Sequence, residues 1–157
     1  MNKIAILNPD DFLGTPRVWT PERNRNAWEE IYSILERNFS QDVADTTLYM
    51  VFGIQGSGKS TFIKNNPDFF SAHAFVVDAA LPAARHRQRA LTLAKQHGVR
   101  AEAVWIDTPL RVALSRNSLR EPDQQVPMEN IVNVHTLLEA PTSEEGFSRI
   151  HRIRENP

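Results

Sequence analysis

Eight consecutive residues match the phosphate-loop pattern G-x-x-x-x-G-K-[ST] at every fixed position: Gly53-Ile54-Gln55-Gly56-Ser57-Gly58-Lys59-Ser60. In this pattern the glycines let successive backbone N–H groups converge on phosphate oxygens. The lysine reaches the outer phosphates and the hydroxyl completes the shell of a Mg²⁺ ion. Lys59 and Ser60 are therefore candidate phosphate and metal contacts, and Thr61 extends the nucleotide-binding set. The pattern predicts a site for ATP, or another nucleoside triphosphate, with Mg²⁺.

The residues on either side of this loop fit the strand and the helix that the pattern requires. Residues 47–52 form an apolar run of strand length, and residues 61–64 can continue as a helix. The start of that helix adds its positive end to the phosphate site. A glycine-rich turn can meet the pattern by chance, but the flanking elements favour nucleotide binding.

Acidic residues follow two further apolar runs. Asp78 ends the run 74–78, and Asp10 and Asp11 come shortly after the run 4–7. In open α/β sheets ligands bind beyond the carboxyl ends of the strands. An acid at the place of Asp78 usually touches the Mg²⁺ shell in phosphate-loop proteins. For Asp10 and Asp11, these residues alone favour a solvated turn or a helix cap.

Length and composition describe an ordinary globular chain. Its 157 residues suit one domain, and its formal net charge of −1 gives no overall positive field for nucleic acid, although a local basic patch is compatible with it. The absence of cysteine excludes disulfides and thiolate metal sites. No apolar run is long enough to span a bilayer, and the N-terminus reads as a strand. We expect a cytoplasmic protein without membrane contact.

Strand-like runs alternate with helical patterns along the chain. A helix is predicted to begin at Thr20-Pro21, and another at Thr108-Pro109, each with a hydroxyl N-cap before proline. The continuous run 4–7 predicts a strand buried on both faces. The alternating run 147–153 predicts an edge strand. A helix over 127–139 should bury Ile131, Val134, Leu137 and Leu138. This order predicts a parallel sheet covered by helices on both faces.

The helix predicted over 82–97 carries basic residues in its first turns: Arg85, His86, Arg87 and Arg89. Positive charge there opposes the helix dipole unless it meets anions. The arginines are therefore candidates for contacts to acceptor phosphates. A solvated charged face explains them equally well.

Several segments outside the phosphate loop carry a more specific pattern. They are Val76-Val77-Asp78-Ala79-Ala80-Leu81, Val104-x-Ile106-Asp107-Thr108-Pro109, Arg116-Asn117-x-x-Arg120, Val126-Pro127 and Leu138-Glu139-Ala140-Pro141-Thr142-x-x-Glu145-Gly146-Phe147-x-x-Ile150. From about Leu48 to the C-terminus, the chain resembles the kinase module of the 5′-hydroxyl polynucleotide kinases. These are nucleic-acid end-healing kinases, often fused to a 3′-phosphatase.

The resemblance implies an α/β P-loop kinase: a three-layer sandwich with a mainly parallel sheet, helices on both faces and a helical lid. It implies one domain over 1–157, divided into an acceptor-side strand and helix (1–46), a nucleotide-binding core (47–107) and a lid with C-terminal elements (108–157). Arg116 and Arg120 would form the lid over the phosphates. The implied activity is ATP-dependent phosphorylation of the 5′-OH end of RNA or DNA.

One part of the chain departs from the family pattern. The family places its acceptor-activating carboxylate after the phosphate-loop helix, in an Asn-x-Asp-Asp-aromatic motif. Here residues 66–74 leave no room for that strand and its helix, and the motif stands at the N-terminus as Asn8-Pro9-Asp10-Asp11-Phe12. We interpret this as a circular permutation, with Asp10 as the catalytic base and Asp11 as the second choice. Leu13 replaces an arginine that the family often has, and Arg17 is a candidate substitute.

Two other functions fit the same residues. The acceptor could be a small molecule, a nucleoside or a nucleotide sugar, as in the zeta-toxin relatives; the near-zero net charge, the small size and Leu13 leave this alternative open. The chain could instead be a nucleotide-binding switch without catalysis. Contacts of the acceptor with Asp11, Arg17, Arg85 and Arg89 are weaker expectations.

Overall fold

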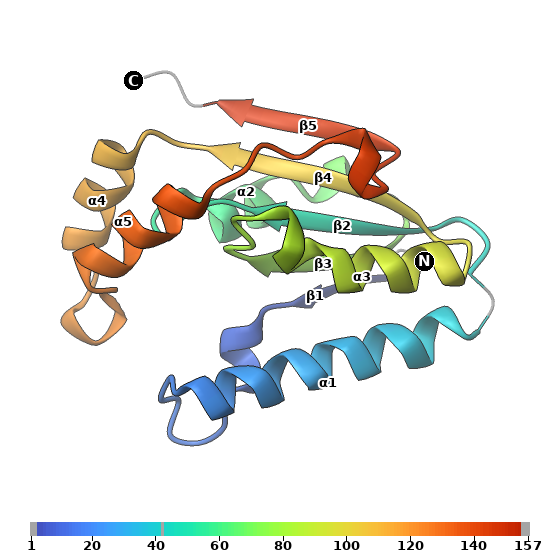
Figure 1. Ribbon diagram of the computed structural model, residues 1–157, viewed down its shortest axis with the longest axis horizontal. Coiled ribbons are helices and arrows are strands. Elements are labelled where there is room, and N and C mark those ends of the chain that lie inside the picture. Colours follow the sequence, from blue (N-terminus) through green and yellow to red (C-terminus); the bar gives the residue numbers. More distant parts are fainter. Residues whose placement is uncertain (1–2, 42, 155–157) are drawn as a thin grey trace.

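A single parallel sheet with the strand order β1-β3-β2-β4-β5 forms the centre of the molecule (Figure 1). The computed structural model describes residues 3–41 and 43–154. The strands are β1 (Lys3–Leu7), β2 (Thr46–Phe52), β3 (His73–Ala79), β4 (Arg100–Asp107) and β5 (Arg149–Arg154). All neighbouring pairs are parallel, so the carboxyl ends of the strands meet at one edge, as the alternating pattern predicts.

Helices cover both faces of this sheet. They are α1 (Pro21–Phe39), α2 (Lys59–Asn65), α3 (Ala84–Gln96), α4 (Leu110–Ser118) and α5 (Met128–Leu137), with short 3-10 turns η1 (Pro9–Phe12), η2 (Pro67–Phe69), η3 (Pro122–Gln124) and η4 (Ser143–Glu145). Alternate residues of β2 point to opposite faces. Met50 packs with residues of α1 and α3 on one face, and Val51 packs with Ile63 of α2 on the other. The predicted three-layer α/β architecture is confirmed.

Helix α1 begins as its sequence predicts. Thr20 is extended, its Oγ1 accepts a 3.0 Å hydrogen bond from the backbone N–H of Arg23, and Pro21 opens the helix. The helix buries every fourth residue, at Ala27, Ile31, Leu35 and Phe39. Its last turn meets the start of β3, where the rings of Phe39 and Phe75 pack edge to face at 5.6 Å.

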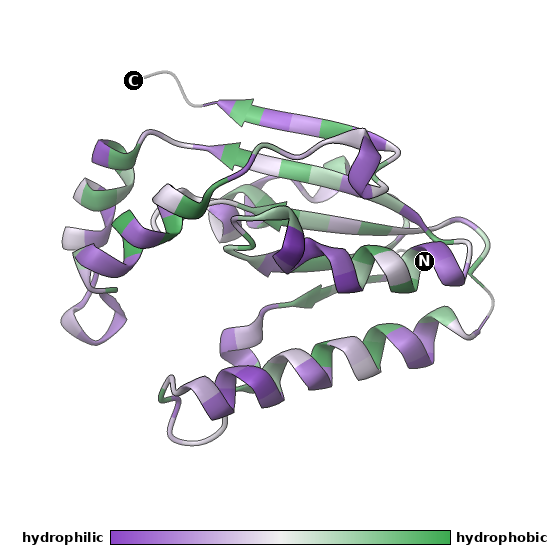
Figure 2. Cartoon of the chain, in the orientation of Figure 1, coloured by the Kyte–Doolittle hydropathy of each residue, from purple (hydrophilic) through white to green (hydrophobic). Residues whose placement is uncertain are grey.

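Two predictions about burial are wrong. Strand β1 is an edge strand and not a doubly buried one, because it pairs only with β3; Ile6 is 52% exposed. In α5 only Ile131 is buried, and Leu137 is exposed, because this helix packs on α4 beyond the sheet. The C-terminal prediction is confirmed: β5 pairs only with β4 at the other edge, and in Figure 2 hydrophilic residues interrupt it.

No helix within residues 3–41 and 43–154 is both long enough and apolar enough to cross a membrane.

Candidate active site

The phosphate loop joins the central strand β2 to α2 and lies tightly against β4 and α4. A Cβ atom built on Gly53 would stand 2.6 Å from the carbonyl oxygen of Ile106. A Cβ atom on Gly56 would stand 2.5 Å from the carbonyl oxygen of Ala113, and Gly56 has a φ of +82°. Only glycine fits such contacts without moving the neighbouring backbone. The loop is therefore fixed by its surroundings.

Ser57 at the centre of the loop is held through its backbone. Its carbonyl accepts a 2.8 Å hydrogen bond from Thr108 Oγ1 and a 3.1 Å hydrogen bond from Arg116 Nη1. Thr108 was expected to cap the following helix. That expectation is wrong, because Pro109 occupies the N-cap of α4 and the Thr108 hydroxyl binds the phosphate loop instead.

Two buried polar atoms of the loop, Ser57 Oγ and Gln55 Oε1, have no hydrogen-bond partner among the described residues. Such atoms cost free energy unless a ligand satisfies them. Together with the glycine contacts, they fit a loop built to surround phosphate oxygens.

Lys59 occupies the first position of α2 and turns back over the loop. Its Nζ donates to the carbonyl oxygens of Gly53 at 2.9 Å and Ile54 at 3.1 Å. Burial lowers the pKa of Lys59 to about 8, the nearby carboxylates of Asp78 and Asp10 act to raise it, and the guanidinium of Arg120 acts to lower it. These three side chains act on Lys59 from β3, from η1 and from the segment that follows α4.

Ser60 and Asp78 form the second part of the site. Ser60 Oγ donates a 2.7 Å hydrogen bond to Asp78 Oδ2, and Asp78 is 3% exposed. No group of three or more histidine, cysteine, aspartate or glutamate side chains in the described segments could hold a metal ion by itself. Hydroxyl and carboxylate oxygens do suit Mg²⁺, which usually keeps several waters and binds through one or two protein groups plus substrate phosphates. Ser60 and Asp78 fit that pattern.

The two N-terminal carboxylates have different surroundings. Asn8 Oδ1 accepts a 2.9 Å hydrogen bond from the backbone N–H of Asp10 and so starts η1. Asp11 forms an exposed ion pair with Arg17 at 3.1 Å. Asp10 acts to raise the pKa of Lys59, so its carboxylate lies within electrostatic range of that side chain. The structure places Arg17 against Asp11 rather than in the position of a separate substrate contact.

The three named residues of the Arg-Asn-x-x-Arg unit make different contacts. Arg116 contacts the phosphate loop, and Arg120 acts on Lys59 as described above. Between them Asn117 is buried, and its amide donates to the carbonyl of Val126 at 2.6 Å while its Oδ1 accepts from the N–H of Val126 at 2.9 Å. This pair closes the loop from α4 to α5. Residue type alone gave no sign of this role for Asn117.

Two arginines of α3 form ion pairs with carboxylates of the same chain. Arg87 is fully buried, donates to Glu145 Oε1 at 2.8 Å and lies 4.6 Å over the ring of Phe52. Arg89 binds both carboxylate oxygens of Glu29 on α1, at 2.6 and 3.0 Å. A phosphate contact by Arg87 is therefore wrong. The structure brings Arg89 to α1 and leaves Arg85 exposed on the same helix, so neither is brought to the phosphate loop.

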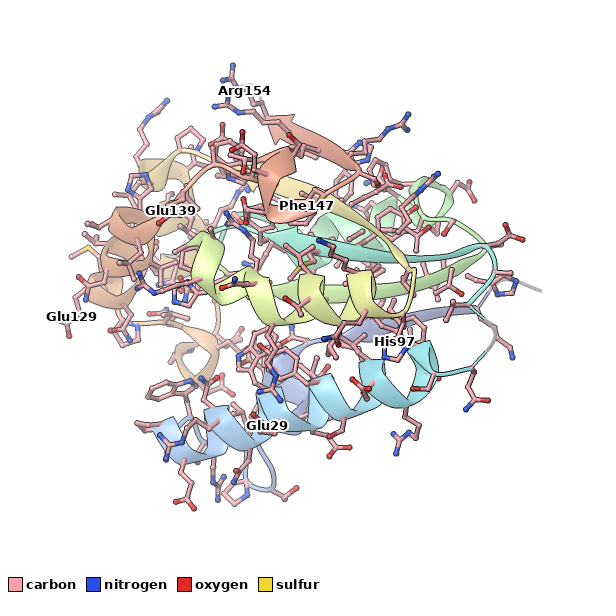
Figure 3. The ribbon with its side chains drawn as sticks, turned by 45° about the vertical axis from the view of Figure 1, so that its right-hand side comes forward. Glu29, His97, Glu129, Glu139, Phe147 and Arg154 are labelled. Carbon is pink, nitrogen blue, oxygen red and sulfur yellow. The ribbon has the colours of Figure 1, made fainter. Side chains whose placement is uncertain are left out.

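The start of α3 has a partner that the sequence did not reveal. Glu139, which follows α5, accepts a 3.1 Å hydrogen bond at Oε2 from the backbone N–H of Ala84, and its own N–H donates to the carbonyl of Pro82 at 2.7 Å. Figure 3 shows Glu139 near the start of α3 and Glu29 on α1 on the other side of that helix. A carboxylate at a helix N-terminus is favourable.

Known proteins resemble this chain in part. Residues 71–141, just under half of the chain, match the family model AAA_33, described as an AAA domain. Among solved structures, AvrRxo1-ORF1:-ORF2 with ATP is similar at 18% identity and a TM-score of 0.50, over 83% of this chain and 60% of that chain. A structure of AvrRxo1-ORF1:AvrRxo1-ORF2 with sulphate ions follows at 19% identity and a TM-score of 0.47, over 79% and 58% of the two chains. No curated protein matches.

The fold is a parallel α/β sandwich with a phosphate loop, consistent with that of the P-loop kinases. The matched residues 71–141 begin after α2, so the family match covers β3, α3, β4, α4 and α5. The present chain spans 60% of the length of the first similar structure.

Proposed function

We propose that this chain is an ATP-dependent kinase that transfers the γ-phosphate to a hydroxyl, and that the acceptor is the 5′-OH end of RNA or DNA. The observation that carries the proposal is the convergence on Lys59. Asp10 from the loop after β1 and Arg120 from the lid both influence its pKa, together with Asp78. A nucleotide switch needs the phosphate loop but has no use for an additional base. The convergence therefore supports catalysis over the switch.

Each residue has a defined task in this proposal. The phosphate loop holds the phosphates through its backbone N–H groups, and Lys59 turns from the carbonyls of Gly53 and Ile54 toward the outer phosphates. Ser60 and Asp78 would hold Mg²⁺, which supplies positive charge to the phosphate oxygens when it is bound. Arg116 and Arg120 stabilise the charge that develops on the transferred group.

Asp10 has the task of a general base. Its carboxylate orients the attacking hydroxyl and accepts its proton, a role typically worth about 10²–10⁴ in rate. The N-terminal hydrogen bond to Asn8 Oδ1 fixes the backbone of Asp10 at the end of β1. Asp11 is engaged by Arg17, and this leaves the base role to Asp10.

The position of β1 and α1 supports a transfer of this segment from the place after α2 to the N-terminus. Because the elements from β3 onward keep their order, this is a transposition of one segment, and the interpretation as a circular permutation is wrong. The backbone N–H of Lys3, the first residue of β1, donates to the carbonyl of Ala72 at 2.6 Å. Ala72 lies just after α2 and η2, where the polynucleotide kinase pattern would insert this strand. At its other end, α1 reaches the start of β3 through the contact between Phe39 and Phe75. Residues 3–40 thus lie between the two ends that they would connect in the family order.

The choice of acceptor rests on the resemblance of the lid and tail segments to polynucleotide kinases. A small-molecule acceptor, such as a nucleoside or a nucleotide sugar, is the second candidate, and the net charge of −1 favours it. Strong salt dependence of acceptor binding would support the nucleic acid, because phosphate contacts release counterions.

The test is transfer of labelled γ-phosphate from ATP to matched acceptors. One oligonucleotide carries a 5′-OH, the control oligonucleotide of the same sequence carries a 5′-phosphate, and a free nucleoside forms a third arm. We expect label on the 5′-OH oligonucleotide alone. Label on the nucleoside but not on the oligonucleotide would show that the acceptor is a small molecule and not a nucleic acid. No label on any acceptor, with ATP still bound, would favour the switch.

A further inference from the structure

The loop between η1 and α1 exposes two large apolar side chains that are neighbours in the sequence. Trp19 is 61% exposed and Val18 is 49% exposed. Trp19 precedes the N-cap Thr20, a position from which an apolar residue often packs against the fourth residue of the helix. That residue is Asn24, which offers no apolar partner. Helix α1 therefore gives no structural reason for a tryptophan at this position.

The loop that carries Trp19 is fixed. Arg23, in the first turn of α1, donates from Nη1 to the carbonyl oxygens of Pro16 at 2.6 Å and Leu13 at 3.3 Å. Leu13 is 5% exposed and anchors the beginning of the loop. The cap at Thr20 fixes its end. Trp19 is thus presented from a defined backbone.

The loop lies beside the carboxylates that follow β1. Arg17, two residues before Trp19, forms the ion pair with Asp11. Figure 1 shows this loop, which leads from β1 into α1, at the same end of the sheet as α4 and α5. Trp19 therefore lies on the loop that directly follows Asp10 and Asp11, at the sheet end that also carries α4 and α5.

We infer that Trp19 stacks against the nucleobase of the acceptor, at the nucleotide whose hydroxyl Asp10 activates. The inference rests on the proposed function and names the acceptor as a nucleotide or nucleoside. Base stacking on an aromatic side chain tolerates every base, because each base has a π-face. A protein partner would need a larger apolar surface than Val18 and Trp19 provide.

The first experiment compares KM for two 5′-OH oligonucleotides, one normal and one whose terminal nucleotide lacks its base. A stack of this kind is worth about 1–3 kcal/mol, so Trp19→Ala should raise KM for the normal oligonucleotide about 5- to 150-fold and change kcat little. Trp19→Phe should restore most of the affinity. For the abasic oligonucleotide, wild type and Trp19→Ala should have the same KM.

An equal rise of KM for both oligonucleotides, or no rise for either, would overturn the stacking. A parallel titration needs no turnover: the normal oligonucleotide, added with a non-hydrolysable ATP analogue, should quench tryptophan fluorescence in wild type and in Trp28→Phe but not in Trp19→Phe. Quenching that persists in Trp19→Phe would also overturn the inference. Quenching without phosphoryl transfer would contradict the proposed reaction but support the stacking. Transfer that is unaffected by substitution of Trp19 would support the reaction but contradict the stacking.

Discussion

Ser60 Oγ donates a 2.7 Å hydrogen bond to Asp78 Oδ2 and thereby ties the first turn of α2 to the end of β3. The bond pre-orients a hydroxyl and a buried carboxylate toward one point beside the phosphate loop. If that point holds Mg²⁺, the pair should matter only when the metal is present.

Ser60→Ala and Asp78→Asn should each weaken ATP binding about 10- to 100-fold in Mg²⁺ and change it little in a chelator, because both act through the metal. Isothermal titration calorimetry in the two conditions measures this. Thr136→Ala is the matched control, since its hydroxyl donates to the carbonyl of Val132 on the exposed side of α5. Equal losses with and without Mg²⁺ would contradict a metal role.

The lowered pKa of Lys59 predicts that nucleotide binding is coupled to the uptake of a proton. Its pKa of about 8 in the free protein lies below the ordinary 10.5, because burial disfavours the ammonium. Phosphates need the charged form, so binding between about pH 8 and 10 should take up a proton, and affinity should fall as pH rises above 8. The stability of the nucleotide-free protein has the opposite pH dependence. Because the pKa of Lys59 is lower in the folded than in the unfolded protein, the free energy of unfolding should rise as pH increases from 8 toward 10.5.

Calorimetry in two buffers of different ionisation enthalpy at pH 8.5–9 measures the proton uptake. Lys59→Arg stays charged throughout this range and should bind ATP without that proton. The same pH dependence in wild type and in Lys59→Arg would show that another group is responsible.

Replacement of Arg87 should strongly lower the stability of the protein. Its buried guanidinium bonds Glu145, and removal of one partner leaves an uncompensated charge that costs about 3–5 kcal/mol. In a protein of this size that corresponds to a fall in Tm of about 6–20 °C for Arg87→Met. Arg89→Met is the matched control on the same helix, because its pair with Glu29 is exposed and should leave Tm nearly unchanged. An equal fall in Tm for the two variants, measured by thermal denaturation, would contradict the stabilising role assigned to the buried Arg87–Glu145 pair.

The transposed position of β1 and α1 predicts that the chain tolerates the family order. A rearranged chain would run from 43 to 72, continue with 3 to 41, and return through a short glycine-serine linker to 73. The 2.6 Å bond between Lys3 and Ala72 indicates that the first junction needs little movement. We expect the same secondary structure by circular dichroism and ATP affinity within about threefold, since each new junction connects segments that lie close together in the structure. A soluble product that does not bind ATP would contradict the proposal that both segment orders give the same structure.

The sequence predicted most of this fold because its signals were local. The phosphate loop, the cap at Thr20 and the runs of β2 and β3 depend on neighbouring residues, and local patterns show them directly. The edge position of β1 depends on which strand it pairs with, and a short apolar run has the same sequence in either place.

The site was less predictable where distant residues decide the outcome. Arg87 looked like a phosphate contact because Glu145, which neutralises it, comes 58 residues later in the chain. Thr108 looked like a helix cap because nothing local showed that its hydroxyl would reach Ser57. In both cases a partner far along the chain determined the role.

The measurement that tests the account most directly is single-turnover transfer of the γ-phosphate to a 5′-OH oligonucleotide by wild type, Asp10→Asn and Asp11→Asn. The amide keeps the size of the side chain and removes the base. Asp10→Asn should lose about 10²–10⁴ in rate while binding ATP normally, and Asp11→Asn should lose less than about tenfold, because it pairs with Arg17. Transfer at the wild-type rate by Asp10→Asn would contradict the assigned base and, with it, the proposed role of the N-terminal segment.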